Sequence, residues 1–170
     1  MYHITYEADR DLSDSITAEM SRIEMSLSPF QPSSIISAIN RGENVRVDKY
    51  IATVFEYSQR VNKASGGAFD PTVGPIVDLW GFGTDKGVKD APTQAQIDSA
   101  LAGVGIWRCK ISDNHIVKPD KGTQFNFSAI AKGYGCDCVA EMLRRNGAEN
   151  YMVEIGGEIA LSGHNPKGRE

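Results

Sequence analysis

The sequence predicts an α+β fold in which helices pack on a mainly antiparallel sheet. Residues 2–7 alternate and are rich in β-formers, which is typical of a strand. Residues 12–27 instead repeat apolar side chains at helical spacing. Strand-like and helix-like segments then follow one another irregularly, which favours α+β over a regular parallel α/β repeat.

The first helix is expected over about residues 12–27. Asp9 or Asp11 can cap it, because a short polar side chain accepts a hydrogen bond from a free N–H of the first turn. Its apolar face consists of residues three or four positions apart: Leu12, Ile16, Met20, Ile23 and Leu27. Pro29 follows, and proline cannot continue a helix.

Two further helices are predicted before residue 66. Residues 33–40 form a short one, with Gly42 just past its end. Asp48 caps a longer one, which Gly66 ends. The apolar face of this longer helix is Ile51, Val54, Phe55 and Val61.

The middle of the chain predicts a short helix and a hairpin. Thr93–Gln96 has the pattern of a capping box and opens a helix that runs to Ala102. Residues 107–117 predict two strands joined around Asp113-Asn114, because these residue types tolerate the turn conformation of a tight hairpin.

The last third of the chain predicts three strands and the longest helix. Residues 124–127 are expected to form a strand, after which Ser128 caps a helix that Gly147 ends. Strands at 151–155 and 158–161 are separated by Gly156-Gly157, which indicates a bulge or a close backbone approach. The sequence ends as though another strand should follow, so the last strand is expected to have one unpaired edge.

Size and composition exclude several classes of protein. The 170 residues suit one domain or part of a larger one, and the net charge of -4 argues against a general nucleic-acid binder. The chain has no apolar run of membrane-spanning length and no signal-like start. Cys109, Cys136 and Cys138 lack disulfide or redox-pair spacing, so we expect inert packed thiols. The three histidines share no metal-ligand spacing.

A glycine-rich segment at residues 65–83 is the most unusual part of the sequence. It holds five glycines, two prolines, three aromatic residues and two carboxylates in 19 residues. Glycine and proline impose backbone geometry, and an ordinary surface loop has no need of Phe69, Trp80 and Phe82. The composition indicates a rigid, partly apolar loop shaped around something flat.

The start of the helix at Ser128 is a candidate anion site, because a first helical turn offers unpaired N–H groups. Lys132 lies one turn in, where the helix dipole disfavours a cation unless it faces an anion such as a pyrophosphate. The alternative is a solvated lysine on an exposed face. Gly133 and Gly135 cost helix stability, which indicates close packing against another backbone or a ligand.

Three segments together, residues 65–83, 126–135 and 153–159, resemble the ApbE family of FAD:protein FMN transferases. The resemblance runs over nearly the whole chain. It implies an α+β, ApbE-like (T-fold-like) domain of which residues 1–170 form the N-terminal part, truncated at the C-terminus.

The resemblance also implies a set of binding residues, although it assigns no catalytic one. FAD is expected to contact six residues: Phe30, Ala68, Phe69, Asp70, Asn126 and Lys132. The backbone carbonyl of Ala129 is expected to bind Mg²⁺. Asn126 stands where the family usually has Asp, so no charge is available there.

Two of these residues have simple alternatives. Phe30 either offers a stacking surface to the flavin or fills the core between two prolines. Asp70 either hydrogen-bonds FAD or bonds its own backbone in a turn.

The activity implied is phosphoryl transfer. A Thr or Ser hydroxyl of an acceptor flavoprotein attacks the FMN phosphorus of FAD, AMP leaves, and Mg²⁺ assists. The alternatives are an FAD-binding or FAD-hydrolysing protein without transferase activity, and a half-domain that pairs with a second copy through its unpaired edge. Family resemblance places the full-length product on the periplasmic side of the inner membrane, held by a lipid anchor.

Overall fold

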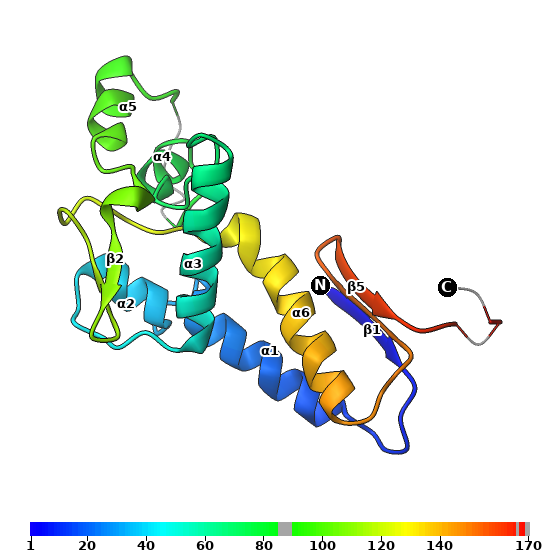
Figure 1. The fold of residues 1–170 in the computed structure, drawn as a ribbon. Helices are drawn as coiled ribbons and strands as arrows, with labels where there is room; N and C mark the ends of the chain where they lie inside the picture. Colours follow the sequence, from blue (N-terminus) through cyan, green and yellow to red (C-terminus); the bar gives the residue numbers. More distant parts are fainter. Residues whose placement is uncertain (85–89, 166, 169–170) are drawn as a thin grey trace. The chain divides into compact units, whose positions relative to one another are not determined.

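The computed structural model describes residues 1–84, 90–165 and 167–168. It contains helices and antiparallel sheets, so the α+β prediction is confirmed (Figure 1). The chain forms two compact units. We call residues 1–24 and 130–170 the sheet unit and residues 25–129 the helical unit.

The sheet unit is built on three antiparallel strands. β1 (Tyr2–Tyr6) pairs with β4 (Tyr151–Ile155), and β4 pairs with β5 (Glu158–Ser162), which gives the order β1-β4-β5. Ile4 lies opposite Val153, and Val153 lies opposite Ala160. These three side chains contribute to one face of the sheet, which packs against the hydrophobic core.

The core of this unit lies between that sheet face and two helices, α1 (Ser13–Leu27) and α6 (Ser128–Arg145). Its buried members come from both helices, from the residue before α1, from the segment after α6 and from β4: Leu12, Ile16, Cys136, Val139, Ala140, Leu143, Ala148 and Val153. The predicted Asp11 cap is confirmed, since its Oδ1 accepts from the Ser13 N–H at 2.9 Å.

The turn between β4 and β5 corrects one prediction. Gly156 and Gly157 form no bulge, because Ile155 pairs directly with Glu158. The close approach given as the alternative is present at Gly156, where an added Cβ would lie 3.0 Å from Lys132 Cδ. The two glycines are the central residues of a tight hairpin, with φ of 58° and 97°. Both left-handed values match the turn type that suits the twist of the flanking strands.

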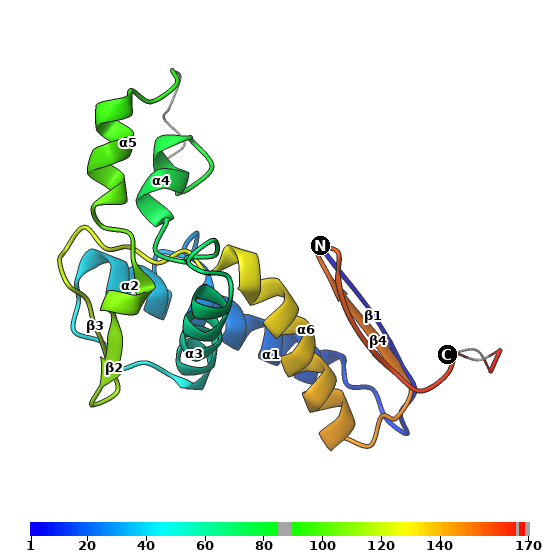
Figure 2. The same ribbon diagram turned by 45° about the horizontal axis from the view of Figure 1, so that its top comes forward.

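The helical unit consists mainly of short elements (Figure 2). In chain order they are α2 (Ile35–Arg41), α3 (Lys49–Ala64), α4 (Gly74–Leu79), α5 (Gln94–Leu101), the 3-10 helix η1 (Ile106–Arg108), β2 (Lys110–Ser112) and β3 (His115–Val117). Figure 2 shows α4 and α5 side by side.

Several local predictions in this unit are confirmed. The Asp48 side chain caps α3 by accepting from the Ile51 N–H, and Thr93 forms the expected capping box with Gln96. β2 and β3 form a hairpin whose turn residues, Asp113 and Asn114, have φ of 50° and 60°. One packing prediction is wrong: a side chain expected on the apolar face of α3, Val61, is 43% exposed.

The strand predicted at residues 124–127 is absent from the described structure. The backbone of Phe125 bonds to a side chain instead, since the Asn40 amide accepts from its N–H and donates to its carbonyl oxygen, both at 2.8 Å. Asn126 donates its N–H to the Pro71 carbonyl oxygen, and Gln124 forms only an isolated bridge with Val73. The side chains of Phe125 and Phe127 are buried in the core, with ring centroids 5.5 Å apart. Their burial explains the apolar pattern of this segment without a strand.

Candidate functional site

The glycine-rich segment of the helical unit is organised by the carboxylate of Asp70. Its Oδ1 accepts from the N–H and the hydroxyl of Thr72 at 2.9 and 2.6 Å. Its Oδ2 accepts from the Asn62 amide at 3.2 Å and from the Ile106 N–H at 3.0 Å. The carboxylate therefore joins α3, its own loop and η1, and its acceptor sites are largely filled. The turn predicted as the simpler alternative for Asp70 is present.

Thr72 extends this network into the interior. Its side chain is completely buried, and its hydroxyl oxygen accepts from the Gly105 N–H at 2.7 Å while donating to Asp70. Sequence reasoning did not assign a role to Thr72 or Asn62. The order Asp70-Pro71-Thr72 is the sequence signal for Thr72, because an Asp followed two residues later by a hydrogen-bond donor is typical of a local turn.

Ala68 and Phe69 lie on the exposed side of this loop. Ala68 is exposed and Phe69 is half-buried. The Phe69 backbone is fixed at both ends, because its N–H donates to Ser65 Oγ at 3.1 Å and its carbonyl oxygen accepts from the Asn62 amide at 2.7 Å. The Phe69 ring is therefore presented from a rigid backbone, as the composition predicts.

Phe30 lies on a separate turn, between α1 and α2. Its side chain is 56% exposed, so the alternative in which it fills the core is wrong. The turn is held by the Ser34 hydroxyl, which donates to the Ser28 carbonyl oxygen at 2.7 Å. No ring contact or hydrogen bond of the described residues joins Phe30 to Phe69.

Asn126 connects the glycine-rich loop to the start of α6. Its backbone N–H donates to Pro71, and its side-chain oxygen accepts from the Ser128 N–H at 3.0 Å. Ser128 is the first residue of α6, so the predicted Ser128 cap is wrong and the neutral Asn126 amide satisfies this N–H. Ala129 follows in the first turn and is exposed, which leaves its carbonyl oxygen with a lone pair beyond the helical bond.

Lys132 lies on α6 in the sheet unit, and neither sequence interpretation describes it fully. Its ammonium pairs with Glu158 Oε1 at 3.0 Å and donates to the Gly156 carbonyl oxygen at 3.2 Å. Both side chains remain partly exposed, at 47% for Lys132 and 39% for Glu158. The lysine is thus held at the β4–β5 turn. Sequence reasoning missed Glu158, because Gly156-Gly157 was interpreted as a bulge or a close backbone approach and not as the hairpin turn that brings Glu158 to Lys132.

The two glycines of α6 lie where this hairpin approaches the helix. A Cβ at Gly135 would lie 3.4 Å from Ile155 Cδ1, and one at Gly133 would lie 3.8 Å from Glu158 Cγ. The next position, Cys136, donates its thiol to the Glu158 carbonyl oxygen at 3.2 Å. Both distances are ordinary van der Waals contacts, so the hairpin approaches the helix at both positions without requiring glycine at either.

The cysteines have a structural character. All three are free, and Cys109 and Cys136 are buried. Burial raises the pKa of the Cys109 thiol to about 11 and also raises the pKa of Cys136. Both thiols therefore stay protonated and unreactive near neutral pH.

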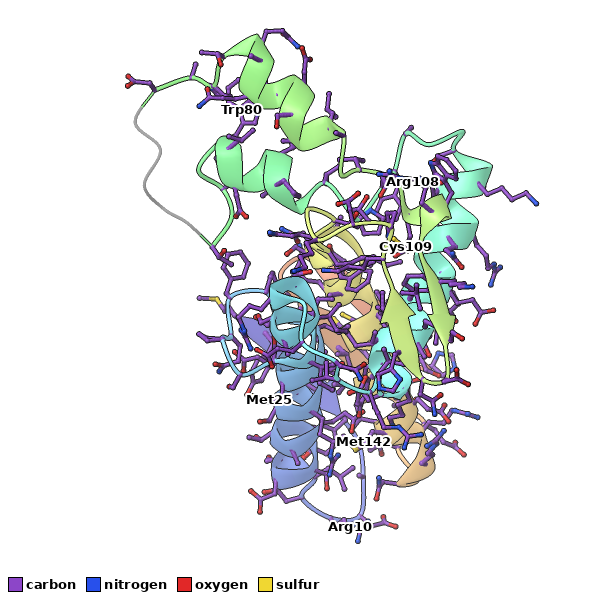
Figure 3. The ribbon with its side chains drawn as sticks, turned by 90° about the vertical axis from the view of Figure 1, so that its left-hand side faces the viewer. Arg10, Met25, Trp80, Arg108, Cys109 and Met142 are labelled. Atoms are coloured by element: carbon purple, nitrogen blue, oxygen red, sulfur yellow. The ribbon has the colours of Figure 1, made fainter. Side chains whose placement is uncertain are left out.

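An open groove of about 620 Å³ lies between α4 and α5. It is lined mainly by small or uncharged side chains, together with Asp78. Trp80, which follows α4 and is 49% exposed, lies by these two helices (Figure 3). Sequence reasoning missed this groove, because α4 falls in a segment whose glycines and prolines predict a loop.

The described residues contain neither a helix of membrane-spanning character nor a cluster of metal-ligating side chains. No helix among them is long and apolar enough to span a membrane. No group of three or more His, Cys, Asp or Glu side chains among them is arranged to hold a metal ion.

Comparison with known proteins gives a consistent result. A model of the ApbE family matches residues 1–170. The FAD:protein FMN transferase of Haemophilus influenzae is 35% identical, over 99% of this chain and 53% of its own length. The transferase of the same name from Vibrio cholerae is 36% identical, over 98% of this chain and 53% of its own length. The chain thus spans about half the length of the curated relatives it matches.

Solved structures agree with this result. The flavin transferase ApbE from Vibrio cholerae superposes with a TM-score of 0.93 at 36% identity, over 99% of this chain and 57% of that chain. The flavinyl transferase ApbE of Pseudomonas stutzeri, in its apo form, superposes with a TM-score of 0.90 at 27% identity, over 99% of this chain and 59% of that chain. The ApbE-like α+β fold predicted from the sequence is confirmed.

The buried Thr72 hydroxyl leads to a prediction on stability. Thr72→Val is expected to lower the free energy of unfolding by about 1–3 kcal/mol, because it leaves the buried Gly105 N–H without its acceptor. Thr72→Ser keeps the hydroxyl and should recover part of the loss. Urea denaturation measures both, with the exposed helical residue Thr17→Val as the matched control. A Thr72→Val protein as stable as the control would contradict the role assigned to this hydroxyl.

Proposed function

This chain belongs to the ApbE family, and from that premise we propose that the protein is an FAD:protein FMN transferase. The observation that carries the proposal is the pair of relatives of this name, which are 35% and 36% identical over 99% and 98% of the chain. The substrate would be FAD, and the acceptor a flavoprotein with a reactive Thr or Ser.

The reaction is a phosphoryl transfer. The acceptor hydroxyl oxygen bonds to the FMN phosphorus, the bond from that phosphorus to the bridging pyrophosphate oxygen breaks, and AMP leaves with the electron pair. The hydroxyl proton is released. Such a reaction requires positioning and charge neutralisation more than covalent chemistry by the enzyme.

The flavin half of FAD is assigned to the helical unit. The exposed ring of Phe30 and the half-buried ring of Phe69 offer flat apolar surfaces, and Ala68 leaves room beside the latter. Asp70 acts chiefly by holding the loop, because its carboxylate is already engaged by Thr72, Asn62 and Ile106.

The phosphate and adenosine half is assigned to the segment that starts α6. Asn126 holds the first N–H of the helix and, being neutral, does not repel a phosphate. Lys132 supplies the positive charge.

Mg²⁺ is part of the proposal, with the Ala129 carbonyl as one ligand. One backbone carbonyl suits Mg²⁺, because this ion takes few protein ligands and completes its coordination shell with phosphate oxygens and water. When bound, Mg²⁺ would neutralise charge on the pyrophosphate. The described residues contain no group of three or more His, Cys, Asp or Glu side chains beside which the ion would bind.

We predict that an acceptor flavoprotein domain gains the mass of FMN less one water after incubation with FAD, Mg²⁺ and the full-length product. Intact-mass spectrometry measures the gain, and EDTA should abolish it. The 170-residue chain assayed in parallel is expected to be inactive, because the relatives are about twice as long.

Two outcomes of this assay would contradict the proposal. FMN and AMP released without a gain on the acceptor would show FAD hydrolysis. FAD retained unchanged would show binding without transfer. The acceptor with its Thr or Ser replaced by Ala is the control for specific attachment.

The proposal extends to the free edge of β5, which pairs only with β4 among the described strands. An unpaired edge with Ile159 and Leu161 exposed at 57% and 65% favours association of the chain with a second copy. We predict that the mass of the 170-residue chain in solution rises with concentration, as measured by light scattering. A constant monomer mass would exclude this pairing.

Resemblance to the family also leads us to propose a lipid-anchored location on the periplasmic side of the inner membrane. Separation of periplasmic, membrane and cytoplasmic fractions measures it for the full-length product. Recovery in the membrane fraction, with the protein accessible to protease added from the periplasmic side, is expected. Recovery in the cytoplasmic fraction would contradict it.

A further inference from the structure

The structure assigns Glu158 as a positioning residue for Lys132, and we propose that it fixes the ammonium that meets a phosphate of FAD. The inference rests on the proposed function, because it concerns the residue to which that function assigns the phosphate charge. Glu158 itself would not touch the substrate.

The contacts of the Lys132 ammonium carry the argument. Nζ lies 3.0 Å from Glu158 Oε1 and 3.2 Å from the Gly156 carbonyl oxygen. An ammonium has three N–H donors, so these two acceptors leave one donor for a further oxygen. The side chain is 47% exposed, which makes that donor accessible to a ligand.

The backbone of the hairpin turn also fixes the stem of the lysine. A Cβ at Gly156 would lie only 3.0 Å from Lys132 Cδ, so the methylene chain rests on the bare backbone of the turn. A free lysine side chain loses rotamer entropy when a ligand immobilises it. A lysine already held at its stem and head pays part of that cost before FAD binds.

The position of Glu158 is in turn fixed by α6. The Cys136 thiol donates to the Glu158 carbonyl oxygen at 3.2 Å. This bond ties the backbone of Glu158 to α6 about one turn beyond Lys132. Helix and hairpin therefore hold the two charged groups in one arrangement.

A carboxylate beside a phosphate-binding lysine has two opposing effects. Its negative charge repels the pyrophosphate, whereas its bond orders the ammonium. Because both side chains are partly exposed, solvent weakens the repulsion, and the geometric effect is expected to dominate. A substitution that removes the carboxylate charge separates the two effects, because loss of repulsion lowers the Kd for FAD and loss of ordering raises it.

The test is Glu158→Gln in the full-length product, with the Kd for FAD measured by flavin fluorescence. We expect about a threefold rise in Kd, in the range of measured exposed ion pairs. Riboflavin, which lacks phosphates, should bind unchanged. Glu149→Gln, at an exposed acidic residue before β4, is the matched control and should leave both values unchanged. Thermal unfolding of each variant shows whether the fold is retained.

A double-mutant cycle distinguishes positioning from a general structural effect. Lys132→Met should raise the Kd for FAD by about tenfold, as loss of a charged hydrogen bond to phosphate does. In that background Glu158→Gln should have no further effect, because Glu158 acts only through Lys132. An equal effect in both backgrounds would overturn the inference.

The remaining outcomes are equally decisive. Tighter or unchanged FAD binding by Glu158→Gln overturns the positioning role and, if Lys132→Met still weakens binding, leaves the proposed function intact. A wild-type protein that binds no FAD rejects the proposed function itself.

Discussion

The bonds of the Asp70 carboxylate are the constraint on which the helical unit depends. Four donor groups of three residues, Asn62, Thr72 and Ile106, converge on it. A loop rich in glycine would lose much conformational entropy on becoming rigid. The carboxylate offsets that loss by replacing lost water contacts with charge-assisted bonds, and the loop can then present Phe69 in one orientation.

In the sheet unit the corresponding constraint is the close approach of α6 to the β4–β5 hairpin. The helix carries Gly133 and Gly135 where the hairpin approaches it, and the hairpin carries Gly156 where Lys132 crosses it. Gly133 and Gly135 lower the stability of the helix, whereas Gly156 suits the left-handed φ of 58° at its place in the turn. The same geometry places a cation and a carboxylate beside each other at the exposed end of the unit.

Local signals predicted much of the fold, since a cap or a hairpin turn depends on a few neighbouring residues. The caps at Asp48 and Thr93 and the Asp113-Asn114 turn are of this kind. The failures depend on distant partners. Residues 124–127 read as a strand, yet their backbone bonds to the side chain of Asn40. The pairing of Lys132 with Glu158 required the hairpin register, which periodicity alone does not set.

The turn between β4 and β5 has a consequence for sequence variation. Its two glycines have similar backbone angles but different surroundings, since a Cβ at Gly157 would meet nothing within 4 Å. At Gly157 any other residue meets only the strain of its left-handed φ of 97°. At Gly156 a side chain would also displace the lysine stem. Substitution at the first position of the turn therefore disturbs Lys132, whereas substitution at the second strains the backbone alone.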